Sequence, residues 1–102
     1  MLQLRPSCEH CDRALPPDAA DARICSFECT FCVECVNDVL GNVCPNCGGG
    51  FEARPIRPRR NWRGDNDVAH HPPSTTVRHS PVDRARHREF AAPIGPIAAR
   101  DR

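Results

Sequence analysis

Eight cysteines constrain this chain more than any other feature, because all of them lie in the first 52 of its 102 residues. They recur at short intervals, in the order C-x2-C-x13-C-x3-C-x2-C-x2-C-x8-C-x2-C. A fold of about 50 residues rarely holds together by hydrophobic burial alone. The cysteines are therefore predicted to hold this part of the chain together.

The spacing favours metal sites over disulfides. Two sulfurs separated by two residues suit one ion in a tight turn, whereas the same separation makes a strained disulfide. Disulfides belong mainly to secreted chains, and Met1 to Cys8 has no apolar stretch or small-residue cleavage site of a signal peptide. The chain also lacks an apolar run of about 18 residues that could span a membrane. We therefore expect a cytoplasmic, metal-binding protein.

Zinc is the predicted metal, because four thiolates around one ion select zinc, with iron as the second choice. Eight cysteines make two such sites, hence two zinc ions per chain. The predicted ligands are Cys8, Cys11, Cys25, Cys29, Cys32, Cys35, Cys44 and Cys47. A site filled by four thiolates has no open position for water or substrate. Both sites are therefore expected to be structural, and the protein is not expected to be an enzyme.

The eight ligands can be divided in two ways, and spacing alone leaves both open. In a cross-brace, one ion is held by Cys8, Cys11, Cys32 and Cys35, and the other by Cys25, Cys29, Cys44 and Cys47. In a sequential arrangement, the first four cysteines, Cys8, Cys11, Cys25 and Cys29, share one ion and the last four share the other.

Little regular structure is expected between the cysteines. Residues 1–7 alternate in the manner of a short edge strand that ends at Pro6, and Arg23 to Cys25 reads as a second extended segment. The apolar spacing of Val36, Val39 and Leu40 predicts one short helix, which Gly41 ends.

Four residues near the cysteines carry further expectations. Phe27 and Phe31 are expected to cover the metal from water, and Gly48 to adopt a left-handed turn after the last cysteine. His10 is expected to be solvated, because eight cysteines already complete two sites.

The composition changes at Ala53. Seven of the eleven prolines and eleven of the fourteen arginines follow residue 52, and the chain has no lysine. The formal charge is −5 for residues 1–52 and +6 for residues 53–102, and two tetrathiolate zinc sites would lower the first value to about −9. We therefore divide the chain into a zinc-binding module, residues 1–52, and a disordered tail rich in arginine and proline, residues 53–102. Within the tail only Asp83 to Ala92 could form a helix.

The tail also contains the one residue that could contact a nucleobase. Trp62 lies within the basic stretch from Arg57 to Arg63, and arginines beside an aromatic ring suit stacking on a base. One aromatic side chain among arginines is weak evidence, so a plain solvated tail is the expectation.

The cysteine pattern resembles a RING-type zinc finger. The resemblance rests on the order of spacings, Phe31-Cys32-x2-Cys35, the short helix and Cys44-Pro-x-Cys47, with Cys29 where a histidine usually stands. It implies a small metal-stabilised RING-like or treble-clef fold, with a short hairpin and one short helix, and it favours the cross-brace. Ubiquitin ligases of this type have an apolar residue after the first cysteine, where this chain has Glu9, so ligase activity is not expected.

Residues Met1 to Pro58 are more closely similar to a group of small bacterial proteins, domain of unknown function 1272. The resemblance is carried by Leu4-Arg-Pro, by Ile24-Cys-Ser-Phe-Glu-Cys-Thr-Phe-Cys32 and by Cys44-Pro-Asn-Cys-Gly-Gly49. It implies a zinc-bound module and supplies no known activity.

These observations predict a non-catalytic zinc-binding module that acts as a protein-interaction or assembly element. The alternative is a thiol-based redox or zinc-responsive switch, in which oxidised cysteines release the metal. The expected partner is an unknown protein, and nucleic acid is a candidate only through the basic tail.

Overall fold

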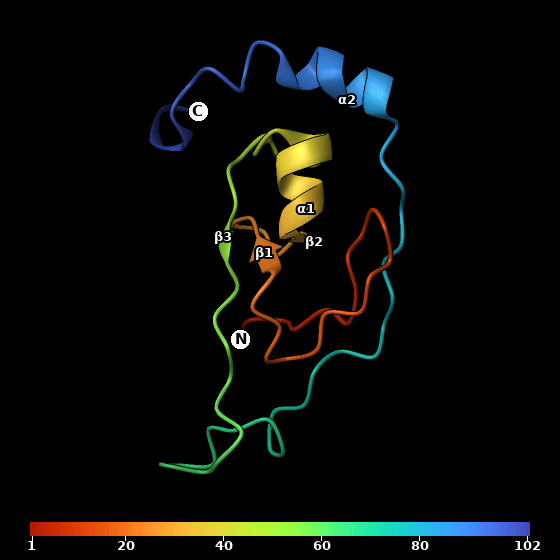
Figure 1. Ribbon diagram of the computed structural model, residues 1–102. Helices are drawn as coiled ribbons and strands as arrows, with labels where there is room; N and C mark the ends of the chain where they lie inside the picture. Colours follow the sequence, from red (N-terminus) through yellow and green to blue (C-terminus); the bar gives the residue numbers. More distant parts are fainter.

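Short strands and helices alternate with long loops in the computed structural model, which describes residues 1–102 (Figure 1). The elements are β1 (Ala22–Ile24), β2 (Thr30–Cys32), α1 (Val33–Cys35), η1 (Val36–Leu40), β3 (Glu52–Ala53), α2 (Arg84–Ala91) and η2 (Ala99–Asp101). The body is elongated, with extents of 45 × 27 × 18 Å. None of its helices has the length and apolar character needed to cross a lipid bilayer.

A three-stranded antiparallel sheet in the order β2-β1-β3 forms the centre of the module. In the β1–β2 hairpin Ala22 pairs with Cys32 and Ile24 with Thr30, so the predicted extended segment is confirmed as β1. The third strand, β3, pairs with β1 and lies across the boundary predicted after residue 52. The hairpin matters for the site because cysteines lie at both of its ends.

The predicted short helix is confirmed, and it follows β2 without a break. It starts as α1 and widens into the π-helical turn η1, with Val36 and Leu40 buried. Gly41 ends the helix at φ +59°, and its N–H donates to the Val36 carbonyl. A residue without a Cβ adopts this left-handed conformation at little cost, which explains the stop.

The core mixes apolar side chains with the cysteines. Phe31 on β2 is 1% exposed, and its ring meets that of Phe51 edge-on, with ring centroids 5.5 Å apart and an interplanar angle of 81°. Leu15 and Leu40 belong to the same buried cluster, as do six of the eight cysteines. Sulfurs and aliphatic groups therefore share one small core, which covers the cysteines on their inner side.

The expected edge strand at residues 1–7 is wrong. This segment contains only an isolated bridge, between Ser7 and Ala14. The carbonyl of Leu4 accepts a hydrogen bond from the N–H of Ser74, at 2.9 Å. The tail, rather than a neighbouring strand, therefore satisfies the backbone at this position.

The expected disorder of residues 53–102 is not what the structure has. This segment follows a defined path along the module, places α2 beside the short helix and ends with η2 (Figure 1). The N–H of Ser80 donates to the Glu9 carbonyl at 2.8 Å, and the His87 ring donates to the Leu40 carbonyl at 2.9 Å. The prediction weighed only apolar burial, whereas the tail is attached largely by polar groups that reach backbone carbonyls of the module.

Candidate metal centre

Four cysteines converge in the first cluster. The sulfurs of Cys8, Cys11, Cys32 and Cys35 all lie within 4.8 Å of one another. The sulfurs of Cys11 and Cys32 are 3.8 Å apart, and all eight cysteines of the chain are free thiols. Four unlinked sulfurs at this separation form a group that could hold one metal ion.

Two local structures position the first cluster. In the turn from Cys8 to Cys11, the Cys11 N–H points at the Cys8 sulfur (3.5 Å) and the Asp12 N–H donates to the Cys8 carbonyl (3.0 Å). Asp12 has φ +64°, so the chain leaves this turn in the left-handed region. The other two sulfurs come from the junction of β2 and α1, where Cys32 and Cys35 lie one helical turn apart.

The second cluster brings together the sulfurs of Cys25, Cys44 and Cys47, again within 4.8 Å of one another. Cys29 lies beside this group without meeting the same limit. Its sulfur accepts a hydrogen bond from the Asn46 amide at 3.4 Å. Burial, and also a hydrogen bond with Cys25, raise the pKa of the Cys29 thiol. The predicted fourth ligand of this site is therefore adjacent to the other three.

The turn from Cys44 to Cys47 has the same backbone hydrogen bond, from residue i+4 to residue i, as the turn from Cys8 to Cys11. The Gly48 N–H donates to the Cys44 carbonyl at 2.8 Å, and the Cys44 N–H donates to the Gly49 carbonyl at 2.8 Å. The Gly49 N–H points at the Cys47 sulfur at 3.4 Å. Gly48 has φ +77°, so the predicted left-handed turn is confirmed.

The first cluster contains the four cysteines that the cross-brace predicts, and the second contains three of its predicted four. The sulfurs of Cys8 and Cys11 lie beside those of Cys32 and Cys35. A sequential arrangement would instead place the Cys25 sulfur beside them. The β1–β2 hairpin explains this result. Cys25 follows the end of β1 and Cys32 ends β2, so antiparallel pairing carries the two sulfurs to opposite ends of the hairpin.

The buried thiols form an environment that suits a cation. Burial raises the pKa of Cys35 and that of Cys44, and neighbouring thiols act in the same direction. A divalent metal ion among the sulfurs would lower these pKa values, because thiols that coordinate a metal lose their protons. The donor set of soft sulfurs fits zinc or iron.

The predicted covering side chains have separate outcomes. Phe31 is buried against the cysteines, as expected, whereas Phe27 is 70% exposed and covers nothing. The backbone of Phe27, rather than its ring, faces the second cluster, because its N–H points at the Cys25 sulfur at 3.3 Å. His10 is half-buried rather than solvated, since its Nδ1 accepts the N–H of Val82 at 2.9 Å.

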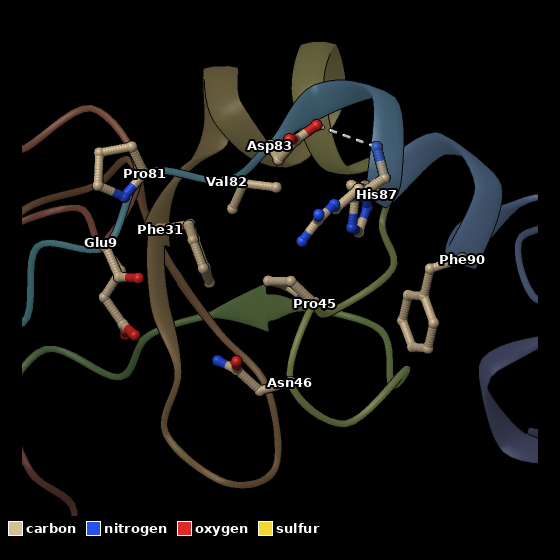
Figure 2. A pocket seen from close by; sticks show the side chains of 11 residues that line it. Glu9, Phe31, Pro45, Asn46, Pro81, Val82, Asp83, His87 and Phe90 are labelled. Carbon is tan, nitrogen blue, oxygen red and sulfur yellow. Dashed lines mark hydrogen bonds between the residues drawn. The ribbon is translucent and has the colours of Figure 1, made fainter.

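A pocket of about 270 Å³ lies between the module and the tail, and sequence reasoning missed it because it exists only once the tail is in place (Figure 2). The labelled residues in this view include Glu9, Phe31 and Pro45 from the module, and Val82, His87 and Phe90 from the tail. The Glu9 carboxylate accepts hydrogen bonds from Arg5 and from the Thr30 N–H. The Glu9 carboxylate is therefore bonded within the module, and the His87 ring bonds the tail to the Leu40 carbonyl of the module.

Two clusters of free cysteines on a three-stranded sheet define a small cysteine-rich domain that could hold two metal ions. The chain belongs to the family described as "Protein of unknown function (DUF1272)", whose model matches residues 1–57. The uncharacterized protein R02474 of Rhizobium meliloti (strain 1021) is 64% identical over 58 residues, which cover 57% of this chain and 69% of that protein. No solved structure matches the chain. The family match includes all eight cysteines and the whole sheet, and it stops before most of the tail.

Proposed function

We propose that this chain is a non-catalytic zinc-binding module with a RING-like cross-brace, and that it serves as a protein-interaction or assembly element. The observation that carries the proposal is the convergence of four sulfurs from Cys8, Cys11, Cys32 and Cys35 within 4.8 Å. A zinc ion held by four thiolates has no vacant position for a substrate. Its contribution is then to fix the shape of the surface around it.

The second site is proposed to use Cys29 as its fourth ligand. Cys25, Cys44 and Cys47 already form a three-sulfur group, and the Cys29 sulfur lies next to it under the Asn46 amide. A hydrogen bond from an amide to a thiolate is the kind of outer contact that orients a metal ligand. The two sites together would contain two zinc ions and all eight cysteines.

Metal analysis of the full chain, purified without added zinc, tests the proposal. We expect two zinc ions per chain, and one ion after either Cys8→Ser or Cys44→Ser. Phe27→Ala is the matched control, because this ring is exposed and covers neither cluster, and it should retain both ions. A count near one in the unaltered chain, or iron with visible charge-transfer colour, would overturn the proposal.

The interaction role needs a second measurement. The zinc-loaded full chain and its Cys8→Ser variant are immobilised side by side, and bound proteins from the same cells are compared. A partner specific to the metal-loaded surface should be retained by the unaltered chain and lost with the variant. Identical retention by both would contradict an interaction surface shaped by zinc.

A redox or zinc-responsive switch is the second candidate, because each cluster has one exposed cysteine, Cys11 in the first and Cys47 in the second. Exposure is what makes a thiolate open to oxidation. Zinc release under mild peroxide, followed with a chromogenic chelator, separates the two proposals. Slow release supports the structural module, whereas fast release that a thiol reductant reverses supports the switch.

A further inference from the structure

A closed loop presents the only tryptophan of the chain to solvent. We call residues 58–68 the tryptophan loop. The N–H of Val68 donates to the Pro58 carbonyl at 2.9 Å and closes it. Inside, the Asn61 amide donates to the Asp65 carboxylate at 2.7 Å and accepts the Asp65 N–H at 3.1 Å. The loop therefore has its own hydrogen-bonded framework.

Trp62 lies on this framework with 75% of its surface exposed. Leaving apolar surface in water forgoes roughly 25 cal/mol per Å², and a tryptophan is the largest such surface that a side chain offers. The turn that follows Trp62 has a defined backbone, with Gly64 at φ +61° and Asp65 at φ +60°, both in the left-handed region. Tryptophan is enriched among the residues that contribute most to binding free energy at interfaces, so this ring is a candidate contact residue.

The arginines in and before the tryptophan loop differ in whether their side chains are bonded to the module or exposed to solvent. Five arginines lie between Ala53 and Gly64, and two aspartates follow in the loop, Asp65 and Asp67, whose carboxylates are hydrogen-bonded to Asn61 and His70. Arg57 is an anchor, because its guanidinium donates to the carbonyls of Leu2 and His71 at 2.7 and 2.6 Å. Arg54 is likewise buried against module carbonyls. The remaining three are exposed and form no ion pair: Arg59, Arg60 and Arg63.

We propose that the tryptophan loop binds single-stranded nucleic acid, with the ring of Trp62 stacked on one base and the three free arginines on adjacent phosphates. Base stacking on an aromatic ring inside a basic surface is the general mode of such binding. Arginine suits it better than lysine, because its planar guanidinium grips phosphate through two donors and also stacks. Duplexes fit less well, since their base faces are covered by neighbouring pairs.

The remaining loop residues favour nucleic acid over a membrane. An interfacial membrane anchor buries a broad apolar face, whereas the neighbours of Trp62 in this loop are arginine, asparagine, glycine and aspartate. The acidic module does not cancel the attraction. Figure 1 shows the loop at one end of the molecule, away from the sheet and the short helix of the module, and exposed charges farther apart than about 8 Å are largely screened at physiological salt.

Intrinsic fluorescence gives a direct test, because Trp62 is the only tryptophan. The full chain, as purified with its metal, is titrated with an oligothymidylate of about 12 nucleotides, which lies within the usual site size. We expect saturable quenching of the Trp62 emission. We also expect the affinity to fall with salt at a log–log slope of about −2, since three phosphate contacts release about 0.7 ions each.

Matched variants assign the effect to the loop. Trp62→Ala should weaken binding about tenfold or more, as expected for one lost stacked base, whereas Trp62→Phe should retain most of the affinity. Replacing the three free arginines by glutamine should remove most of the salt dependence. The control triple, Arg78→Gln with Arg86→Gln and Arg88→Gln, removes the same charge from exposed tail arginines outside the loop and should bind normally.

Several outcomes would overturn the inference. These are an absence of quenching, equal affinity of Trp62→Ala, equal loss in the control triple, or preference for a duplex of the same length. A blue shift of Trp62 emission with phosphatidylserine vesicles, without oligonucleotide binding, would assign the loop to membranes instead. Circular dichroism and metal content of each variant show that the fold is intact. The inference does not depend on the proposed zinc module, whose own test is the metal count.

Discussion

Residues 1–57 and residues 58–102 belong to one body, but different forces hold them in place. The first part contains the sheet, both cysteine clusters and 20 of the 22 buried residues. The second part contributes only Asp67 and His87 to the buried set, and both are polar. The comparison teaches that a chain can be ordered by apolar packing around two cysteine clusters in one half and by single hydrogen bonds in the other.

The consequence is a difference in cooperativity. Apolar packing around two clusters makes the first part unfold as a unit, because each element buries surface against the others. Hydrogen bonds on a largely exposed segment can open one at a time, and such segments have low local stability. The four predictions below test this contrast, beginning with the largest expected effect.

Metal removal should unfold residues 1–57. Structural zinc supplies roughly 10–16 kcal/mol of apparent binding free energy, which is more than a core of this size can replace. Circular dichroism of the full chain before and after a strong chelator measures the effect, and restoring zinc is the control. An unchanged spectrum after verified metal loss would show that apolar packing alone holds the module.

Loss of one ligand should damage one cluster and spare the other. Cys8→Ser should disturb Cys32 and Cys35, because their sulfurs converge with that of Cys8. Amide chemical shifts around Cys44 should stay nearly unchanged, and Cys44→Ser should give the converse pattern. Shifts centred on Cys25 after Cys8→Ser would instead indicate the sequential pairing and contradict the structure.

Two phenylalanines offer the sharpest contrast within the module. Phe31→Ala should cost about 3–5 kcal/mol of unfolding free energy, since it removes a fully buried ring that packs on Phe51. Phe27→Ala should change stability by less than about 0.5 kcal/mol, because its ring is exposed. Urea unfolding with zinc in excess measures both, and equal destabilisation would mean that the Phe27 ring packs in solution.

Those two rings also show where sequence reasoning succeeded and where it failed. Spacing identified the cysteines as the site residues but left their grouping open, and the positions of Gly41 after the helix and Gly48 after the last cysteine identified two left-handed turns. Such features are local, because a few adjacent residues decide them. Which ring faces the core depends instead on where the strands form: Phe31 lies on β2, paired with Arg23 of β1, whereas Phe27 lies in the turn between the two strands.

The tail was predicted poorly for a related reason. Its attachments are single hydrogen bonds to backbone carbonyls that lie far away in the sequence, such as that from His87 to Leu40. Composition reports how much apolar surface a segment can bury, and it contains no information about the position of an acceptor. The pocket between module and tail, and the division of arginines into anchors and free cations, follow from the same long-range contacts.

The smallest expected effect concerns the start of α2. The Asp83 side chain accepts the N–H of Arg86 at 3.1 Å and so caps this helix. Asp83→Ala should cost about 1 kcal/mol, which corresponds to about fivefold faster hydrogen exchange for the amides of residues 87–91. Asp83→Asn retains a capping oxygen and is the control, with little change expected. Exchange in β1 should not respond to either variant, because the tail opens without the module; faster exchange there would mean that the two parts unfold together.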